Sequence, residues 1–254
     1  MSTLSFPSSS DAQPLNLREL DLPSPLTLVV LAPHPDDFDA VGVTLRTFHQ
    51  RGDTIHLAVL TTGASGVEDG FADAVNDEQK AALREKEQAD SCGFFGLPRE
   101  RLTFMRLAPD EKGNPKLDDA NHVRIRDYLS SRQPDLVFMP HGNDSNVTHQ
   151  RTYALFRAVA LAEQMTTLAV PNQDAKTIAI RTDLYTPFDE AAAVWKAELL
   201  RLHVSQHQRN LNTRGHGFDD RVLQINRQSA QQLQQTVGID AAYAEVFELE
   251  RFAP

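Results

Sequence analysis

Cysteine is nearly absent from this chain of 254 residues: Cys92 stands alone, which excludes an internal disulfide framework and a thiolate-rich zinc site. No apolar run approaches the roughly 20 residues that span a bilayer. Positive charge is also scarce, since 25 Lys and Arg face 35 Asp and Glu, and the resulting net charge of -10 argues against a nucleic-acid surface. The Ser- and Pro-containing start has no basic region followed by an apolar core, so we expect no signal peptide and a cytoplasmic protein.

What the chain does contain is an alternation of short apolar runs and longer helical patterns. The apolar runs predict strands buried on both faces, at residues 26–32, 54–62, 102–107 and 134–140. Helices are expected at residues 38–52, 78–95 and 118–131, and a fourth ends near residue 163. A further strand is expected at 177–186. A helix then starts near Phe188, and its apolar stripe is typical of core packing.

This order of elements predicts an α/β fold, a Rossmann-like three-layer αβα sandwich with a mostly parallel sheet. Residues 1–24 are expected to form a flexible N-terminal segment because of their Ser and Pro content. No linker interrupts the remainder, so residues 25–254 are predicted to form a single domain.

Acidic and imidazole side chains directly follow two of the predicted strands. They are His34, Asp36 and Asp37 after the first strand, and His141, Asp144 and His149 after the fourth. Ligands of open parallel sheets bind outside the carboxyl ends of the strands, so two such loops can converge across a crevice. A histidine and a carboxylate three residues apart, joined by a distant histidine, form a three-ligand set with an open position, as in catalytic zinc sites. The adjacent carboxylate is then free to act as a base.

The same residues also fit a purely structural role. His-Pro and Asp-Asp pairs are common in turns, and Asp37 is a suitable N-cap for the helix that follows. Residue periodicity does not distinguish these two interpretations. A nucleotide-binding α/β protein fits poorly, because no Gly-x-Gly-x-x-Gly follows the first strand and the aspartates would repel a phosphate.

Five spaced segments favour the metal site over the purely structural role, because together they resemble a known family. They are APHPDD (32–37), TTGASG (61–66), REKEQADSCGFFG (84–96), LRLHVSQ (200–206) and AYAEVFEL (242–249). Together with a second His-bearing loop, these segments closely resemble, in order, the PIG-L/LmbE-like family of zinc-dependent N-deacetylases. Agreement at five separate places is a specific signal, and it extends over residues 26–249.

The resemblance implies a metal site and a reaction. His34, Asp37 and His149 match the family's metal ligands, and Asp36 matches its general base. The implied cofactor is Zn²⁺, although two histidines and one carboxylate also suit another divalent metal. The implied reaction is hydrolysis of the N-acetyl group of an amino sugar or glycoconjugate by a metal-activated water.

The chain departs from the family pattern at several positions. Phe38 stands where a Glu is common, and Ala64 replaces an acidic residue of the Thr-x-Gly loop. In the second metal loop, Asn146 and Thr148 replace the His and Asp of His-Pro-Asp-His. Asn146 can donate a hydrogen bond to substrate, but it cannot titrate and so cannot act as the general acid.

Two histidines are candidates for the missing acid. His141 is favoured because its loop must reach the metal, and His203 matches the family's late histidine; either one also fits a structural role. Among residues expected near the substrate, Arg84 either contacts hydroxyls or phosphate or forms a surface pair with Glu87. Asp144 is expected to orient the loop or a ligand histidine from behind.

These observations lead to two rival functions. The first is the deacetylase, with the loop at residues 63–76 as a lid or substrate wall. The second is a pseudoenzyme that keeps the metal and binds a ligand without turnover, motivated by Asn146. A homo-oligomer is compatible with either function.

Overall fold

The structure is a computed structural model that describes residues 13–253. Its centre is one mixed sheet with the strand order β1-β7-β8-β6-β5-β2-β3-β4, and β9 pairs with β6. The strands are β1 (Leu15–Asn16), β2 (Thr27–Ala32), β3 (Thr54–Val59), β4 (Leu102–Phe104), β5 (Leu136–Pro140), β6 (Thr167–Asn172), β7 (Leu184–Phe188), β8 (Tyr243–Phe247) and β9 (Glu250–Phe252). Strands β4, β3, β2, β5 and β6 are parallel, whereas β8 and β9 run antiparallel to β6.

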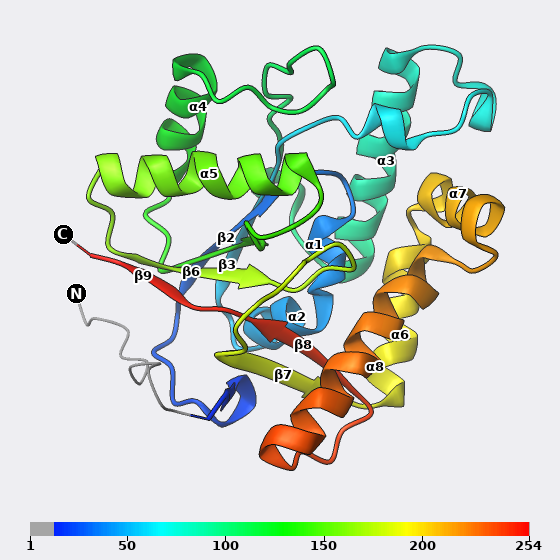
Figure 1. The fold of residues 1–254 in the computed structure, drawn as a ribbon. Coiled ribbons are helices and arrows are strands. Elements are labelled where there is room, and N and C mark those ends of the chain that lie inside the picture. Colours follow the sequence, from blue (N-terminus) through cyan, green and yellow to red (C-terminus); the bar gives the residue numbers. More distant parts are fainter. Residues whose placement is uncertain (1–12, 254) are drawn as a thin grey trace.

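Helices cover both faces of this sheet (Figure 1). They are α1 (Asp37–Ala40), α2 (Gly42–Gln50), α3 (Asp77–Phe95), α4 (Asp119–Ser130), α5 (Val147–Ala162), α6 (Glu190–Arg201), α7 (Val204–Arg214) and α8 (Phe218–Val237). Alternate residues of β2 enter opposite cores: Leu28 and Val30 pack towards α2 and α3, and Val29 and Leu31 pack towards α4 and α5. The predicted three-layer αβα sandwich is confirmed, and the period-2 alternation explains why this strand is apolar throughout.

The helix expected after the first strand is broken into two helices in the structure. The segment divides into α1 and α2 at Val41, where the backbone departs from helical angles (φ -116°, ψ 25°). The buried carboxylate of Glu245 accepts hydrogen bonds from the amides of Val43 (3.1 Å) and Thr44 (2.7 Å). A second helix start is therefore stabilised inside the expected helix, because free amides at a helix start need acceptors.

The C-terminal half contains the elements that the sequence did not predict. Strand β6 was missed, and the strand expected at 177–186 is limited to β7, from Leu184 onwards. Helices α7 and α8 were also missed, and the strands β8 and β9 were not assigned. The buried pattern of this half arises from tertiary contacts more than from local apolar runs.

The N-terminal boundary of the fold also lies earlier than expected. Within the segment expected to be flexible, Leu15–Asn16 pairs in parallel with β7, and Leu17 is buried in the core. An apolar side chain and a short strand within this segment therefore have partners in the fold. Residues 1–12 lie outside the described part of the chain.

Within residues 13–253, no helix combines the length and the apolar character that a membrane crossing requires.

Candidate metal centre and its cavity

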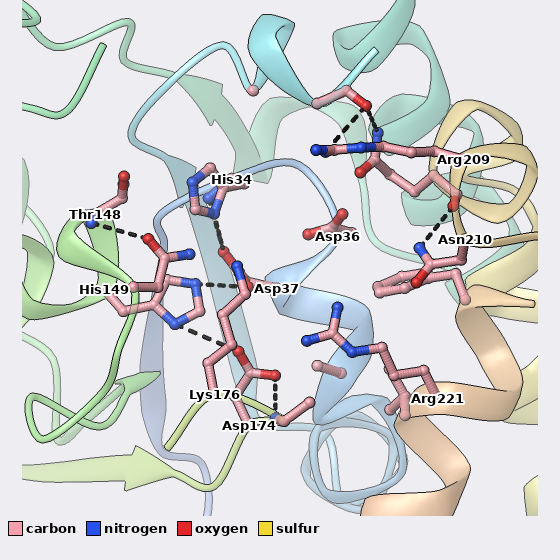
Figure 2. A pocket seen from close by; sticks show the side chains of 18 of the residues that line it. His34, Asp36, Asp37, Thr148, His149, Asp174, Lys176, Arg209, Asn210 and Arg221 are labelled. Atoms are coloured by element: carbon pink, nitrogen blue, oxygen red, sulfur yellow. Dashed lines mark hydrogen bonds and ion pairs between the residues drawn. The ribbon is translucent and has the colours of Figure 1, made fainter. Parts of the chain in front are cut away.

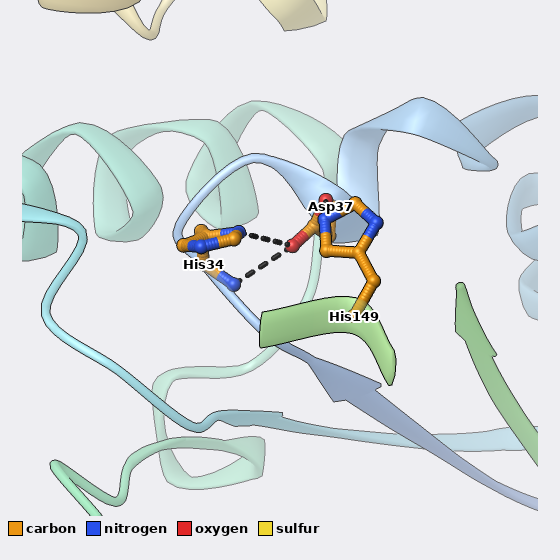
Figure 3. A group of neighbouring side chains, drawn as sticks. All are labelled: His34, Asp37 and His149. Carbon is orange, nitrogen blue, oxygen red and sulfur yellow. Dashed lines mark hydrogen bonds and ion pairs between the residues drawn. The ribbon is translucent and has the colours of Figure 1, made fainter. Parts of the chain in front are cut away.

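The turn between β2 and α1 gathers the first two predicted ligands. Oδ2 of Asp37 accepts a hydrogen bond from the backbone amide of His34 (2.7 Å) and lies 3.2 Å from His34 Nδ1 (Figure 3). The Asp37 side chain thus turns back over the end of the buried strand instead of capping the first turn. A side-chain cap is also missing at the preceding residue, Asp36.

The third predicted ligand arrives from the neighbouring strand. His149 lies in the first turn of α5, which follows β5, and its Nε2 is 3.6 Å from Asp37 Oδ1. Because β5 and β2 are adjacent and parallel, their carboxyl ends bring the two loops together. One ligand atom from each of His34, Asp37 and His149 can be chosen so that all three lie within 4.8 Å of one another (Figure 3). This is a metal-sized cluster of two imidazoles and one carboxylate.

Electrostatics link two members of the cluster. Burial alone would raise the pKa of Asp37, but the charge of His149 and the hydrogen bonds from His34 hold that pKa at about 2. Burial alone would lower the pKa of His149, but Asp37, Asp144 and Asp174 raise it to about 9. The site is therefore arranged to hold positive charge between carboxylates, which is also what a bound cation supplies.

Two further carboxylates lie behind His149. Its Nδ1 is 3.2 Å from Asp144 Oδ2 and 3.4 Å from Asp174 Oδ2. Asp144 is fully buried, and it also accepts from the Asn146 amide, so it contacts both His149 and the loop that it was expected to orient. Asp174 follows β6 and was missed with that strand, although an Asp after a recognised strand would have been the signal. Burial raises its pKa, and His149 opposes the shift.

Asp36 faces the same region in an unusual backbone conformation. Its φ is 118°, a sparsely populated region for a residue other than glycine, which costs on the order of 1–3 kcal/mol. Arg84 Nη2 donates to Asp36 Oδ2 at 2.7 Å and also to the carbonyl of Pro35. The Asp36 amide donates to Gln88 Oε1 at 2.9 Å. These contacts from α3 hold the carboxylate in place beside the metal cluster.

Arg84 is a buried residue rather than a surface one. Its side chain is 2% exposed, and Nη1 lies 3.3 Å from Glu87 Oε2. Glu87 in turn accepts from the amide (2.6 Å) and the hydroxyl (2.8 Å) of Ser205 on α7. The expected pair with Glu87 thus exists, but it belongs to a buried chain of contacts that ends on Asp36.

The two candidate acids lie outside the cavity. His141 Nε2 is 3.2 Å from Glu248 Oε2, and its Nδ1 accepts from the Asn143 amide, so its ring is turned away from the cluster. His203 is fully buried with Nε2 2.6 Å from Asp39 Oδ2. Neither histidine is among the residues that line the cavity, so in this structure neither is brought together with the candidate metal ligands.

The departures from the family pattern have different structural meanings. Phe38 is fully buried in the core and packs edge-on against Phe95, so it faces no substrate. Asn146 lines the cavity, and its Oδ1 caps α5 by accepting from the Thr148 amide at 3.0 Å. Thr148 donates from its hydroxyl to Asn114 Oδ1 at 2.9 Å, which ties this loop to the segment before α4.

A cavity of about 360 Å³ opens above the cluster. One side is formed by His34, Asp36, Asp37, Arg84, Asn146 and His149, with Gly63, Ser65 and Gly66 from the loop expected as a wall. Asp174 and Lys176, which follow β6, line the cavity close to His149 and Asp37 (Figure 2). The remaining lining residues from α7 and α8 include Gln206, Arg209, Asn210, Arg214, Phe218 and Arg221. A cavity of this size takes a small-molecule ligand.

The fold and the cluster together define an α/β protein with a His-Asp-His cluster that could hold a metal ion at the carboxyl edge of its sheet. The PIG-L family model, described as GlcNAc-PI de-N-acetylase, matches residues 29–160, which is more than half of the chain. The chain therefore belongs to the PIG-L family, and the resemblance drawn from its motifs is confirmed. No curated protein matches the sequence.

Solved structures show the same fold. The N,N'-diacetylchitobiose deacetylase from Pyrococcus horikoshii has a TM-score of 0.73 and 17% identity, over 90% of this chain and 85% of that one. A deacetylase–teicoplanin complex has a TM-score of 0.64 and 15% identity, over 90% of this chain and all of that one. The 4-carboxy-2-hydroxymuconate hydratase GalB from Pseudomonas putida KT2440 has a TM-score of 0.67 and 18% identity, over 90% of this chain and 98% of that one. The fold thus supports more than one reaction, so the reaction must be argued from the site.

Proposed function

We propose that this protein holds one divalent metal ion, Zn²⁺, on His34, Asp37 and His149, and removes the N-acetyl group of an amino sugar or glycoconjugate. The observation that carries the proposal is the cluster of three ligand atoms within 4.8 Å on a cavity wall, with Asp36 on the same turn. Membership of the PIG-L family and the deacetylases among the solved structures support the same reaction.

The donor set fits such an ion. Two imidazoles and one carboxylate leave a coordination position open for reactants, and Asp144 fixes the ring of His149 through Nδ1, leaving Nε2 for the ion. When bound, Zn²⁺ supplies a Lewis acid for the amide carbonyl and for water.

The protein's own residues divide the remaining work. Asp36, held by Arg84, is placed to take a proton from the attacking water. Asn146 uses its Oδ1 to cap α5, so its amide NH₂ is left to donate a hydrogen bond to the substrate. Because Asn146 cannot titrate and His141 and His203 lie elsewhere, Asp36 also returns the proton to the leaving nitrogen.

The test measures metal content and acetate release from N-acetylated sugars for the wild type and three variants. We expect about one metal per wild-type chain, loss of metal and activity in Asp37→Ala, and retained metal in Asp36→Asn with activity about 10²–10⁴-fold lower. His141→Ala is the matched control and should keep both properties, since its ring lies outside the cavity.

The outcomes separate the rival functions. Metal without turnover on any acetylated sugar would favour a ligand-binding pseudoenzyme and point to Asn146 as the cause. A protein that takes up no metal after addition of Zn²⁺ or Fe²⁺ would overturn the proposal altogether. Comparing these two ions also identifies the metal, since the ligand set suits several.

A further inference from the structure

Four cationic side chains line the cavity besides Arg84, although the whole chain carries a net charge of -10. These four residues, called the basic wall, are Lys176 from the segment after β6, Arg209 and Arg214 from α7, and Arg221 from α8. Figure 2 labels Lys176, Arg209 and Arg221. Lys176 and Arg221 are half-buried, whereas Arg209 and Arg214 lie exposed at the rim. Cations are thus concentrated where a ligand would enter.

None of these four side chains forms an ion pair with a carboxylate in the described part of the chain. Arg209 donates to the carbonyl of Gly66 (3.4 Å), and Arg214 donates to Asn210 Oδ1 (3.5 Å) and Thr213 Oγ1 (3.4 Å), all neutral acceptors. Other arginines pair closely with acids: Arg106 with Glu78 and Glu85, Arg181 with Asp183, and Arg201 with Asp219. The cavity thus gathers four cations that have no carboxylate partner of their own.

The acids of the cavity already have partners. Asp36 is paired with Arg84 at 2.7 Å, and Asp37 lies between His34 and His149. Asp174 contacts His149, and Arg221 acts on it only through its field. Four cations thus face at most one shared acid, so an anion entering the cavity meets a favourable potential.

The positions of these residues separate recognition from chemistry. The metal cluster and Asp36 come from the part of the chain that matches the family model, residues 29–160. The basic wall comes entirely from later residues. In Figure 2, Arg221 projects from α8 across the cavity towards Asp36 and Asp37, and Lys176 lies beside Asp37.

We propose that the natural substrate is an N-acetylated amino sugar that carries an anionic group, a phosphate ester or a carboxylate, and that Arg221 and Lys176 bind this group with Arg209 and Arg214 at the rim. This inference rests on the proposed deacetylase function and narrows its substrate class. Arginine and lysine are the side chains best suited to such oxyanions, arginine by bidentate and lysine by point-charge contacts.

The experiment compares four substrates that share one N-acetyl group. N-Acetylglucosamine 1-phosphate, its 6-phosphate and the carboxymethyl glycoside are anionic, and the methyl glycoside is neutral. We expect a higher kcat/KM for at least one anionic substrate, and this preference should weaken with added salt. Preference for the phosphates alone identifies a phosphate ester, and preference for the carboxymethyl glycoside identifies a carboxylate.

Variants place the effect on the wall. Arg221→Gln should lower the ratio of kcat/KM between the preferred anionic substrate and the methyl glycoside about tenfold or more, the usual effect of losing one hydrogen bond to a charged group. Arg227→Gln is the matched control: Arg227 lies on the same helix, outside the cavity, and donates to the Tyr243 hydroxyl. It should leave the ratio unchanged.

A binding measurement makes the inference independent of turnover. Zinc-loaded Asp36→Asn protein is titrated with N-acetylglucosamine 1-phosphate, the carboxymethyl glycoside and the methyl glycoside, with and without Arg221→Gln. Equal affinity for all three, or equal weakening of all three by Arg221→Gln, would overturn the inference while leaving the deacetylase intact. Binding of an anionic sugar that depends on Arg221, without acetate release by the wild type, would support the anion site and refute the deacetylase.

Discussion

Two adjacent aspartates acquire different tasks from their surroundings. Asp37 lies between His34 and His149 and has a pKa of about 2, so it is an anion ready for a cation. Asp36 points to Arg84, which fixes the carboxylate at one oxygen. Residue spacing shows only a pair of carboxylates after a strand, and the family resemblance is what names Asp37 as the ligand and Asp36 as the base. The division between ligand and base depends on α3 and α5, which bring Arg84 and His149 to the turn.

A histidine away from the site gives a prediction about pH. Burial, with Arg132 and Arg101 nearby, lowers the pKa of His56 on β3 from its ordinary value of 6.5. In acid the unfolded chain therefore binds a proton at this position before the folded chain does, and folding becomes less favourable as the pH falls below 6.5. We expect His56→Gln to lose less stability than the wild type between pH 7.5 and pH 5.

The measurement is the urea midpoint of both proteins at the two pH values. A smaller midpoint shift in His56→Gln would agree with the prediction, whatever its stability at pH 7.5. An identical shift in both proteins would show that His56 titrates alike in the folded and unfolded chain.

At the scale of elements, Asn146 connects the site to helix α5. Its Oδ1 accepts from the Thr148 amide at 3.0 Å, which satisfies one of the free amides at the helix start. Asn146→Ala should lower the free energy of unfolding by about 1 kcal/mol, whereas Asn146→Ser should stay close to the wild type, because serine is an equally good N-cap.

Urea unfolding of the metal-free proteins measures this difference without a contribution from metal binding. Equal stability of the alanine and serine variants would mean that the cap contributes little, and that Asn146 serves the cavity alone.

The strands show how far the sequence could predict the elements of the fold. Strands β2, β3 and β5 were predicted within a few residues because each is a buried apolar run, and a run buried on both faces has a strong pattern. Strand β6, TLAVPN, contains Pro171 within its run, and a proline inside a run weakens the signal for a central strand. Asp174 was lost with it, although the sheet order makes its position after β6 a natural one.

Helix α8 is one of the C-terminal helices that the sequence analysis did not predict. It is polar over most of its length, and only a few of its apolar side chains, such as Ala230 and Leu233, are buried. Ala230 and Leu233 pack with Tyr185, Ala244 and Val246 of β7 and β8. Because α7, α8 and β6 were not predicted, the basic wall that they carry was not predicted either, whereas His34, Asp37 and His149 were named as candidate ligands from their motifs.

Across the whole molecule, the unpredicted C-terminal elements support the predicted site. Strand β8 lies between β6 and β7, and its Glu245 is a buried acid inside an otherwise apolar strand, YAEVF. This carboxylate accepts from the amides at the start of α2 and from Lys196 Nζ at 2.7 Å. A buried acid in a strand is expected only where a fixed partner neutralises it.

Lys196 is the partner that joins these parts, and its removal gives the strongest predicted loss of stability. Its Nζ is fully buried and donates to Ala40 O (2.6 Å) at the end of α1, Asn226 Oδ1 (2.7 Å) on α8 and Glu245. Lys196→Met leaves the Glu245 charge buried without its partner, so we expect unfolding to become easier by about 3–5 kcal/mol. Adding Glu245→Gln removes that charge but keeps an acceptor for α2, so the double variant should recover part of the loss.

Urea unfolding of both single variants and the double variant at pH 7 provides the test, because a coupled pair gives a non-additive cycle. Additive losses would show that the two side chains stabilise the fold independently, and that the tie between β8 and the helix carrying Asp37 is not electrostatic.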